Sequence, residues 1–428
     1  MLGLSSIDLI VILIYFIVLI FIGFWSMRRV KDQEDYFLGG RKFGKVIQMF
    51  AAFGQATSAD TGPSVATTTM NNGASGIWSA LMMLFSTPSY WFTGVWYRRL
   101  RLLTMGDFFA ERYSSKFLGA SYAILASISL TLLLSVGFIG MSKTVLVMTP
   151  KSLEELTVSE KEEYMQARKL EKLEAADFTT LSQQEKQELE TLRKIKPQSN
   201  FSHIDKGILI LTIVIIVMIY SIAGGLEAAF ISDMMQGIFI IILSILLIPF
   251  AMTQINQIYG SEGFMGAMRT IHKQLPESFF EIFGSPNSID FTWYYIIAIG
   301  VMATINVAVG ANQLVATGSA KNEYNARFGL TYGTYLKRIT TVLWGVTALA
   351  AVLLFGNDVT DPDHLWGYAS RELLGPLNIG LIGLMIAALM AALMSTADMM
   401  MITASGLLTS SFYRPYFGGK SEKHYVTM

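Results

Sequence analysis

The 428-residue chain is too apolar for an ordinary soluble domain, because 52% of its residues are hydrophobic, 15% are charged and the mean hydropathy is +0.46. Soluble domains carry roughly 25% charged residues. The chain has no cysteine, which excludes disulfide bonds, thiolate chemistry and cysteine-built metal sites. Its formal net charge of zero indicates neither an acidic nor a basic partner.

Apolar segments near or above the roughly 20 residues that cross a bilayer recur along the whole chain. They are Ile7–Met27, Val46–Met70, Ile77–Tyr97, Leu118–Met148, Gly207–Ala223, Met234–Met252, Phe291–Thr317, Ile339–Phe355 and Ile379–Phe412. The first segment is too long for the core of a signal peptide and no cleavage pattern follows it, so we expect a retained helix. The sequence therefore predicts an all-α polytopic membrane protein with nine spans.

Basic residues are distributed unevenly over the loops, which predicts the orientation of the chain in the membrane. With the N-terminus outside, eighteen of the 32 lysines and arginines would lie in cytoplasmic loops. These are Arg28, Arg29, Lys31, Arg41, Lys42, Lys45, Arg98, Arg99, Arg101, Arg112, Lys116, Lys321, Arg327, Lys337, Arg338, Arg414, Lys420 and Lys423. Lys143 lies near the outer end of the fourth span, and we expect its long side chain to extend toward water.

Residues 149–206 form a long hydrophilic insertion, which would lie outside the cell in this orientation. Thr157–Glu160 and Ser182–Glu185 both fit a capping box, so the insertion is predicted to be a helical hairpin. We expect it to be a solvated decoration, with partner binding as the alternative. The predicted organisation is 1–148 transmembrane, 149–206 extracytoplasmic and 207–428 transmembrane with a cytoplasmic end.

The apolar run Ile386–Ala404 carries Ser395, Thr396 and Asp398 in its middle. A charge near the bilayer centre costs at least about 2.5–3.5 kcal/mol, so a carboxylate there indicates a function. Together with Ala392, these positions follow one side of a helix and offer oxygen atoms to a small cation. For each hydroxyl taken alone, the alternative is a hydrogen bond to a carbonyl one turn earlier.

The second and seventh spans each contain residues that weaken a helix. Gly54–Ser64 includes Pro63, which predicts unwinding near the middle of the second span. Thr304–Gln313 predicts a similar weakness five spans later. Two interrupted helices in corresponding positions indicate a five-plus-five inverted repeat with its binding site at the midplane. Asp233 follows a Gly-Gly turn and is predicted at the N-terminal end of the sixth span.

Three stretches resemble the solute:sodium symporters, a family that includes sodium/glucose, sodium/proline and sodium/sialic-acid transporters. They are Tyr36–Arg41, Gly224–Gln236 and Ala391–Thr396, and the resemblance extends from Ile7 to the end of the chain apart from the insertion. It implies a LeuT-type five-plus-five core preceded by one extra helix. The chain supplies eight of the ten core helices, so we expect a truncated core in which the last two are missing.

The resemblance also implies a sodium ion between the first and eighth core helices. Carried over by position, its ligands are the backbone carbonyls of Gly54, Thr57 and Ala392 and the hydroxyls of Ser395 and Thr396. Five hard oxygen atoms suit a small hard cation.

Some members of the family hold a second sodium ion with an aspartate that matches Asp233. Two serines that assist it there are Asp398 and Met399 here. The resemblance therefore implies either a second ion site or a protonatable pair formed by Asp233 and Asp398.

For the solute, the resemblance implies polar contacts at positions matching Ser58 and Thr61. Asn306, Asn312 and Gln313 are weaker candidates from the seventh span. The residues that recognise sugars elsewhere in the family are absent, and the solute stays unnamed.

The expected function is sodium-coupled symport of a small organic solute by alternating access, with Na+ as the coupling ion and no enzymatic activity. The expected partners are the lipid bilayer and the solute, with no nucleic acid, and the expected location is the cell membrane, plasma or inner. Two alternatives remain: a transporter-like membrane sensor, and a proton-coupled carrier of the same fold in which Asp233 and Asp398 matter more than Ser395 and Thr396.

Overall fold

A computed structural model describes residues 3–27, 33–284, 290–421 and 424–425. Within these ranges the regular secondary structure is helical, apart from two isolated β-bridges. Four basic residues on which the predicted orientation depends lie outside the described residues: Arg28, Arg29, Lys31 and Lys423.

The α-helices are α1 (Ser6–Met27), α2 (Gln33–Leu38), α3 (Lys45–Gln55), α4 (Thr61–Asn72), α5 (Trp78–Leu81), α6 (Tyr90–Leu100), α7 (Met105–Arg112), α8 (Lys116–Met148), α9 (Val158–Ala175), α10 (Gln183–Ile195), α11 (Lys206–Tyr259), α12 (Gly263–Gln274), α13 (Trp293–Val309), α14 (Ala311–Gly318), α15 (Glu323–Phe355), α16 (Leu365–Leu374), α17 (Leu381–Gly406) and α18 (Arg414–Tyr416). Short 3-10 turns are η1 (Gly39–Arg41), η2 (Gly73–Ile77), η3 (Thr87–Ser89), η4 (Glu277–Phe280), η5 (Pro362–His364) and η6 (Gly375–Leu377), and η7 (Leu407–Tyr413) is a π-helical turn after α17.

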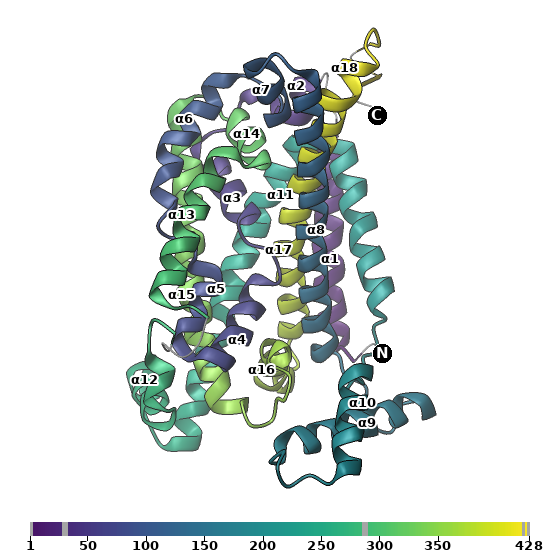
Figure 1. Cartoon of the computed structure of the whole chain (residues 1–428), viewed down its shortest axis with the longest axis vertical. Helices are drawn as coiled ribbons and strands as arrows, with labels where there is room; N and C mark the ends of the chain where they lie inside the picture. Colours follow the sequence, from purple (N-terminus) through teal and green to yellow (C-terminus); the bar gives the residue numbers. More distant parts are fainter. Residues whose placement is uncertain (1–2, 28–32, 285–289, 422–423, 426–428) are drawn as a thin grey trace.

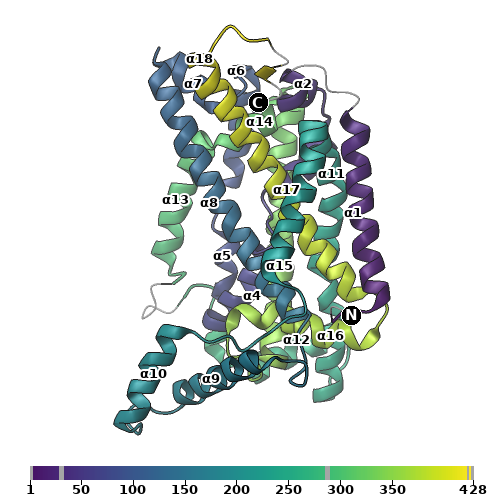
Figure 2. The same ribbon diagram turned by 90° about the vertical axis from the view of Figure 1, so that its right-hand side faces the viewer.

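The membrane helices stand side by side, and α3 and α11 contact each other and both α15 and α17 (Figure 1). The N-terminus and the α9–α10 hairpin lie at the same end of the molecule, and α18 lies at the opposite end. Turned by 90°, α1 lies against α11 on one side and α13 forms the other side (Figure 2). This arrangement buries α17, the helix that carries the predicted ion ligands, inside the bundle.

Five helices in the described residues are long and apolar enough to cross a membrane, and a sixth span results if α13 and α14 are counted as one. These six match predicted spans. The remaining three predicted spans are divided or short: the second and third each consist of shorter helices, and the fifth is the apolar helix Lys206–Ile222. Interrupted helices are thus more frequent than the sequence predicts.

Both interruptions that the sequence predicts are present. The second span breaks between Gln55 and Thr61, and the seventh bends by 54° between α13 and α14 at Gly310. Pro63, however, lies in the first turn of α4 rather than in the break. Amides there have no partner within a helix, so proline costs nothing and instead helps to start the second half.

The third span is divided where the sequence predicts one continuous helix. α5 ends at Leu81 and α6 begins only at Tyr90. The Ala80 carbonyl, which no longer has a helical partner, accepts a hydrogen bond from Arg338 Nη1 at 2.8 Å. Irregular backbone at membrane depth needs such a partner, because no water is available to satisfy it.

α11 changes direction at Gly225, whose φ of +53° is a conformation that glycine adopts readily. A Cβ atom there would lie 2.7 Å from the Tyr36 carbonyl oxygen. The turn divides α11 into Lys206–Ile222 and Gly224–Tyr259. Asp233 therefore lies more than two turns inside the second part, and the prediction that it sits at the helix start is wrong. A helix dipole acts mainly within the first turn, so it does not stabilise this carboxylate.

α15 begins at Glu323 instead of the predicted Ile339, which places Lys337 and Arg338 within a membrane-spanning helix rather than in a cytoplasmic loop. The added turns are rich in small and polar residues, which lower the hydropathy of the segment. Those residues serve close packing: a Cβ atom at Gly333 would lie 2.3 Å from a backbone oxygen of α3. Hydropathy alone therefore missed the first turns of α15, which are stabilised by packing against α3.

The insertion contains two helices, α9 and α10, and both predicted capping boxes are formed. The side chains of Thr157 and Ser182 each accept a hydrogen bond from the amide three residues later, and the glutamate at that position bonds back. Hydrogen bonds from Lys151 and from Thr157 lower the pKa of Glu160 to about 2. The local sequence thus determines where both helices begin.

Candidate functional site

The last turn of α3 meets the middle of α17 at Gly54. Gly54 is buried, and a Cβ atom at this position would lie 2.1 Å from Ser395 Oγ. Only glycine permits an approach that close. Because α3 ends one residue later, at Gln55, the carbonyl groups of its last turn have no continuing helix to bind them. The α3 main chain and the Ser395 hydroxyl therefore lie against each other.

Thr396 contacts the same place. Its hydroxyl lies 3.5 Å from the Gly54 carbonyl oxygen and 3.3 Å from that of Ala392, so it makes the local contact one turn earlier and also reaches α3. The Thr57 amide donates to the Gly54 carbonyl at 2.9 Å, which folds the break back over the end of α3. The structure thus brings together the predicted sodium ligands of α3 and α17.

Two fully buried carboxylates adjoin these groups. Ser395 Oγ donates to Asp233 Oδ1 at 2.5 Å, and Tyr220 Oη donates to Asp398 Oδ2 at 2.9 Å. Both aspartates have 0% exposure, and the second oxygen of each has no hydrogen-bond partner among the described residues. A buried charge needs a partner, so this pair calls for a cation or a proton. Ser395 touches both of the predicted ion sites, which are therefore contiguous.

Three further polar residues of this cluster were not predicted as site residues. Gln236 Nε2 donates to Tyr15 Oη at 3.3 Å, and the Tyr15 hydroxyl lies 3.7 Å from Met394 Sδ. Tyr220 is the third. All three are buried, and each is a polar group within an apolar helix. A polar residue isolated in an apolar helix could have been recognised from the sequence as a candidate site residue. Tyrosine is harder to recognise in this way because its ring is largely apolar.

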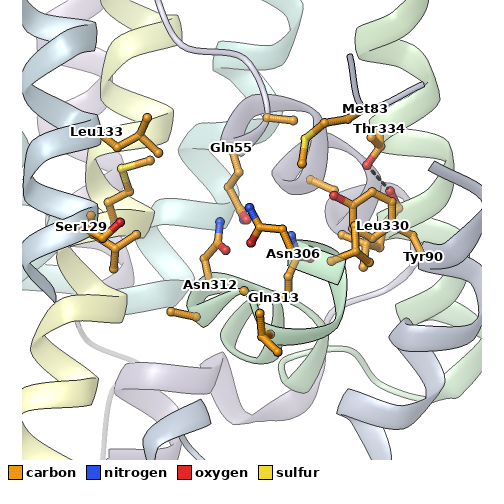
Figure 3. A pocket seen from close by; sticks show the side chains of 18 of the residues that line it. Gln55, Met83, Tyr90, Ser129, Leu133, Asn306, Asn312, Gln313, Leu330 and Thr334 are labelled. Carbon is orange, nitrogen blue, oxygen red and sulfur yellow. Dashed lines mark hydrogen bonds between the residues drawn. The ribbon is translucent and has the colours of Figure 1, made fainter. Parts of the chain in front are cut away.

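A cavity of about 530 Å³ lies on the other side of α3, between α6, α8, α13, α14 and α15. Gln55, Asn306 and Asn312 point toward one another there from α3, α13 and α14 (Figure 3). The volume is in the range of small-molecule sites, roughly 300–1,000 Å³. The structure therefore places both asparagines predicted for the solute at one cavity, together with Gln55, which was not predicted.

Ser58 and Thr61 line neither this cavity nor a smaller one of about 220 Å³ beside α4 and α8. At the smaller cavity Lys143 forms an ion pair with Asp363 of η5, so its side chain is paired rather than merely extended toward water. Burial acts to raise the pKa of Asp363, but the hydrogen bond and charge of Lys143, together with a hydrogen bond from Thr67, hold the pKa below its usual value.

A helical membrane protein with interrupted helices beside a cavity has the architecture of a secondary transporter. The model of the sodium:solute symporter family matches residues 202–428, which is more than half of the chain. The chain therefore belongs to the sodium:solute symporter family, and its function is sodium-coupled solute symport.

Relatives with known roles are similar along almost the whole chain. The osmoregulated proline transporter OpuE of Bacillus subtilis (strain 168) is 23% identical over 99% of this chain and 74% of its own length. A sodium/proline symporter of Staphylococcus aureus (strain JH9) is 23% identical over 97% of this chain and 70% of its own length. The structure of a Na+-coupled sialic acid symporter, substrate-bound and outward-open, superposes with a TM-score of 0.69 at 16% identity, covering 99% of this chain and 77% of that one. This likeness confirms the predicted LeuT-type fold.

Proposed function

We propose that one sodium ion, carried as cargo, binds between α3 and α17. Its ligands would be the carbonyls of Gly54, Thr57 and Ala392 and the hydroxyls of Ser395 and Thr396. The observation that supports this most is the close approach at Gly54, where a Cβ atom would lie 2.1 Å from Ser395 Oγ. Because glycine has no Cβ, the Ser395 hydroxyl lies directly against the main chain of α3. All five groups are neutral oxygen donors, which suit a monovalent hard cation.

We propose further that the solute is a small organic molecule that binds in the 530 Å³ cavity at Asn306 and Asn312. Ser58 and Thr61, in the adjoining break and at the start of α4, would contact it in another state of the transport cycle. The proline and sialic acid carried by relatives fit this size class. The N-terminus and residues 149–206 would face outward in the cell membrane, with inward transport of both cargoes.

Uptake by the full chain in proteoliposomes, with an inward sodium gradient or a potassium gradient, tests this assignment. We expect Ser395→Ala combined with Thr396→Ala to raise the half-saturating sodium concentration by about tenfold or more, since each removed ligand costs about 1–3 kcal/mol. Thr403→Ala is the matched control, because Thr403 carries a buried hydroxyl on the same helix, whose partner among the described residues is Met399 Sδ. An unchanged sodium requirement in the double variant would mean that sodium binds elsewhere.

A second candidate concerns the coupling ion. Asp233 lies against Ser395 and Asp398 against Tyr220, and each carboxylate has one oxygen without a partner among the described residues. We propose that the pair holds either a second cation or one shared proton, since two like charges in so dry a place do not both stay ionised without compensation. The ratio of sodium to solute and the pH dependence of uptake distinguish the two forms.

A further inference from the structure

The charged side chains that line the 530 Å³ cavity are both basic. They are Lys337 and Arg338, neighbours on α15, and no aspartate or glutamate is among the lining residues. Around them the wall is polar but neutral or apolar, with Gln55, Asn306, Asn312 and Gln313 among its polar members. Two positive charges at membrane depth are costly unless something compensates them.

Within the protein this compensation is incomplete. Arg338 is 5% exposed; its Nη1 donates to the Ala80 carbonyl, while its Nε has no hydrogen-bond partner among the described residues. The Lys337 carbonyl accepts hydrogen bonds from Thr340 and Thr341, but its ammonium group has no ion pair or hydrogen bond among the described residues. Asp60 is the acidic residue whose charge acts on Lys337, but it lines the smaller outer cavity. The lysine and arginine therefore share no acidic partner at the cavity wall.

Unused hydrogen-bond donors occur at the same wall. Gln55 Nε2 is buried and without a partner, as is Arg338 Nε. Lys337 adds an ammonium group, so three donors from α3 and α15 border one cavity. An unsatisfied buried donor destabilises the protein, and a carboxylate, with two oxygens and about four lone pairs, can satisfy several donors at once.

We propose that the solute is an organic anion whose carboxylate binds to Lys337, Arg338 and Gln55, with the remainder of the molecule facing Asn306, Asn312 and the apolar wall. This inference rests on the proposed function, because it assigns a solute class to the same cavity. Arg338, already fixed to Ala80, orients the carboxylate, and Lys337 contributes charge from a longer and more mobile side chain.

The test compares acids with neutral molecules of nearly the same shape in sodium-driven uptake by the full chain in proteoliposomes. The pairs are lactate and lactamide, nicotinate and nicotinamide, and sialic acid and its methyl ester. We expect sodium-dependent uptake of the acid, and not of its neutral counterpart, in at least one pair. Equal uptake of both members would overturn the anion assignment and leave sodium-coupled transport intact.

The variants are Lys337→Met, Lys337→Arg and, as the control, Lys321→Met at an exposed lysine just before α15. We expect Lys337→Met to lower the apparent affinity for the transported acid by about tenfold or more, Lys337→Arg to retain most of it, and Lys321→Met to match the parent. Lys337 is preferred to Arg338 as the test because Arg338 also holds the Ala80 carbonyl. Unchanged acid uptake in Lys337→Met would overturn the inference.

Sodium binding gives a separate readout. Stabilisation of the purified protein against heat by sodium should be the same in Lys337→Met and in the parent, and should be lost in the Ser395→Ala, Thr396→Ala variant. If this pattern holds and no acid is taken up, the anion assignment fails alone. If sodium stabilises neither the parent nor Lys337→Met and drives no uptake, the proposed function fails as well.

Discussion

Two neighbouring residues at the end of α3 face regions of opposite charge. Gly54 lies against Ser395 and Asp233, whereas Gln55 borders the cavity that Lys337 lines. The acids and the cations are thus buried in the same bundle but on different sides of one helix. If they met, they would neutralise each other. Because they are kept apart, the acidic region can bind a cation and the basic region can bind an anion. Co-transport of an ion and a solute requires two such separate sites.

The largest effects are expected from single substitutions at Gly54 and at Gln55, one on each side of α3. Gly54→Ala should nearly abolish sodium-dependent uptake, because its Cβ would overlap Ser395 Oγ. Gln55→Ala should leave the half-saturating sodium concentration unchanged and raise that of the solute several-fold, since it removes one donor worth about 0.5–1.5 kcal/mol. Initial uptake rates across sodium and solute concentrations measure both. Identical profiles for the two variants would show that α3 does not separate two sites.

A smaller effect is expected from Asp398→Asn, which keeps the shape of the side chain and its contact with Tyr220. If the acidic pair holds a second cation, the variant should move fewer sodium ions per solute. If the pair shares a proton, the sodium ratio should stay the same and the pH dependence of uptake should shift. Reversal potentials measured at several solute and proton gradients give the ratio.

The control for this variant is Asp358→Asn, which removes an exposed carboxylate outside the bundle and should change neither property. A variant Asp398→Asn that matches the parent in both stoichiometry and pH profile would return Asp398 to a structural role.

The smallest effect is expected at the hairpin, whose many charges lie in water rather than in the bundle. Its contact with the rest of the chain includes a hydrogen bond from Thr360 to Glu171 at 2.9 Å. Such exposed interactions contribute little, so replacing residues 157–196 by a short Gly/Ser linker should preserve membrane insertion and uptake. Surface expression and sodium-driven uptake are the measurements. Lost uptake at normal expression would assign the hairpin a role in gating or in partner binding.

Local sequence was sufficient wherever the controlling interactions are local. The break around Gly54–Ser64, the weakness near Gly310 and both capping boxes of the hairpin could be predicted because glycine, proline and capping residues act within one turn. Prediction failed at α15, whose first turns look like a polar loop. There the helix depends on close packing against α3, which hydropathy does not register.

The sequence by itself determined that this chain is a membrane protein, that its second and seventh spans are interrupted and which residues on α17 offer oxygen atoms to a cation. Only the tertiary structure decided which of these groups meet: Ser395 reaches Asp233 across 162 positions of sequence, and Arg338 reaches Ala80 across 258. The tertiary structure also shows that Lys337 and Arg338, predicted in a loop, line a cavity. The physical reason is that burial and charge compensation depend on neighbours distant in sequence, whereas helix breaking and capping depend on residues a few positions away.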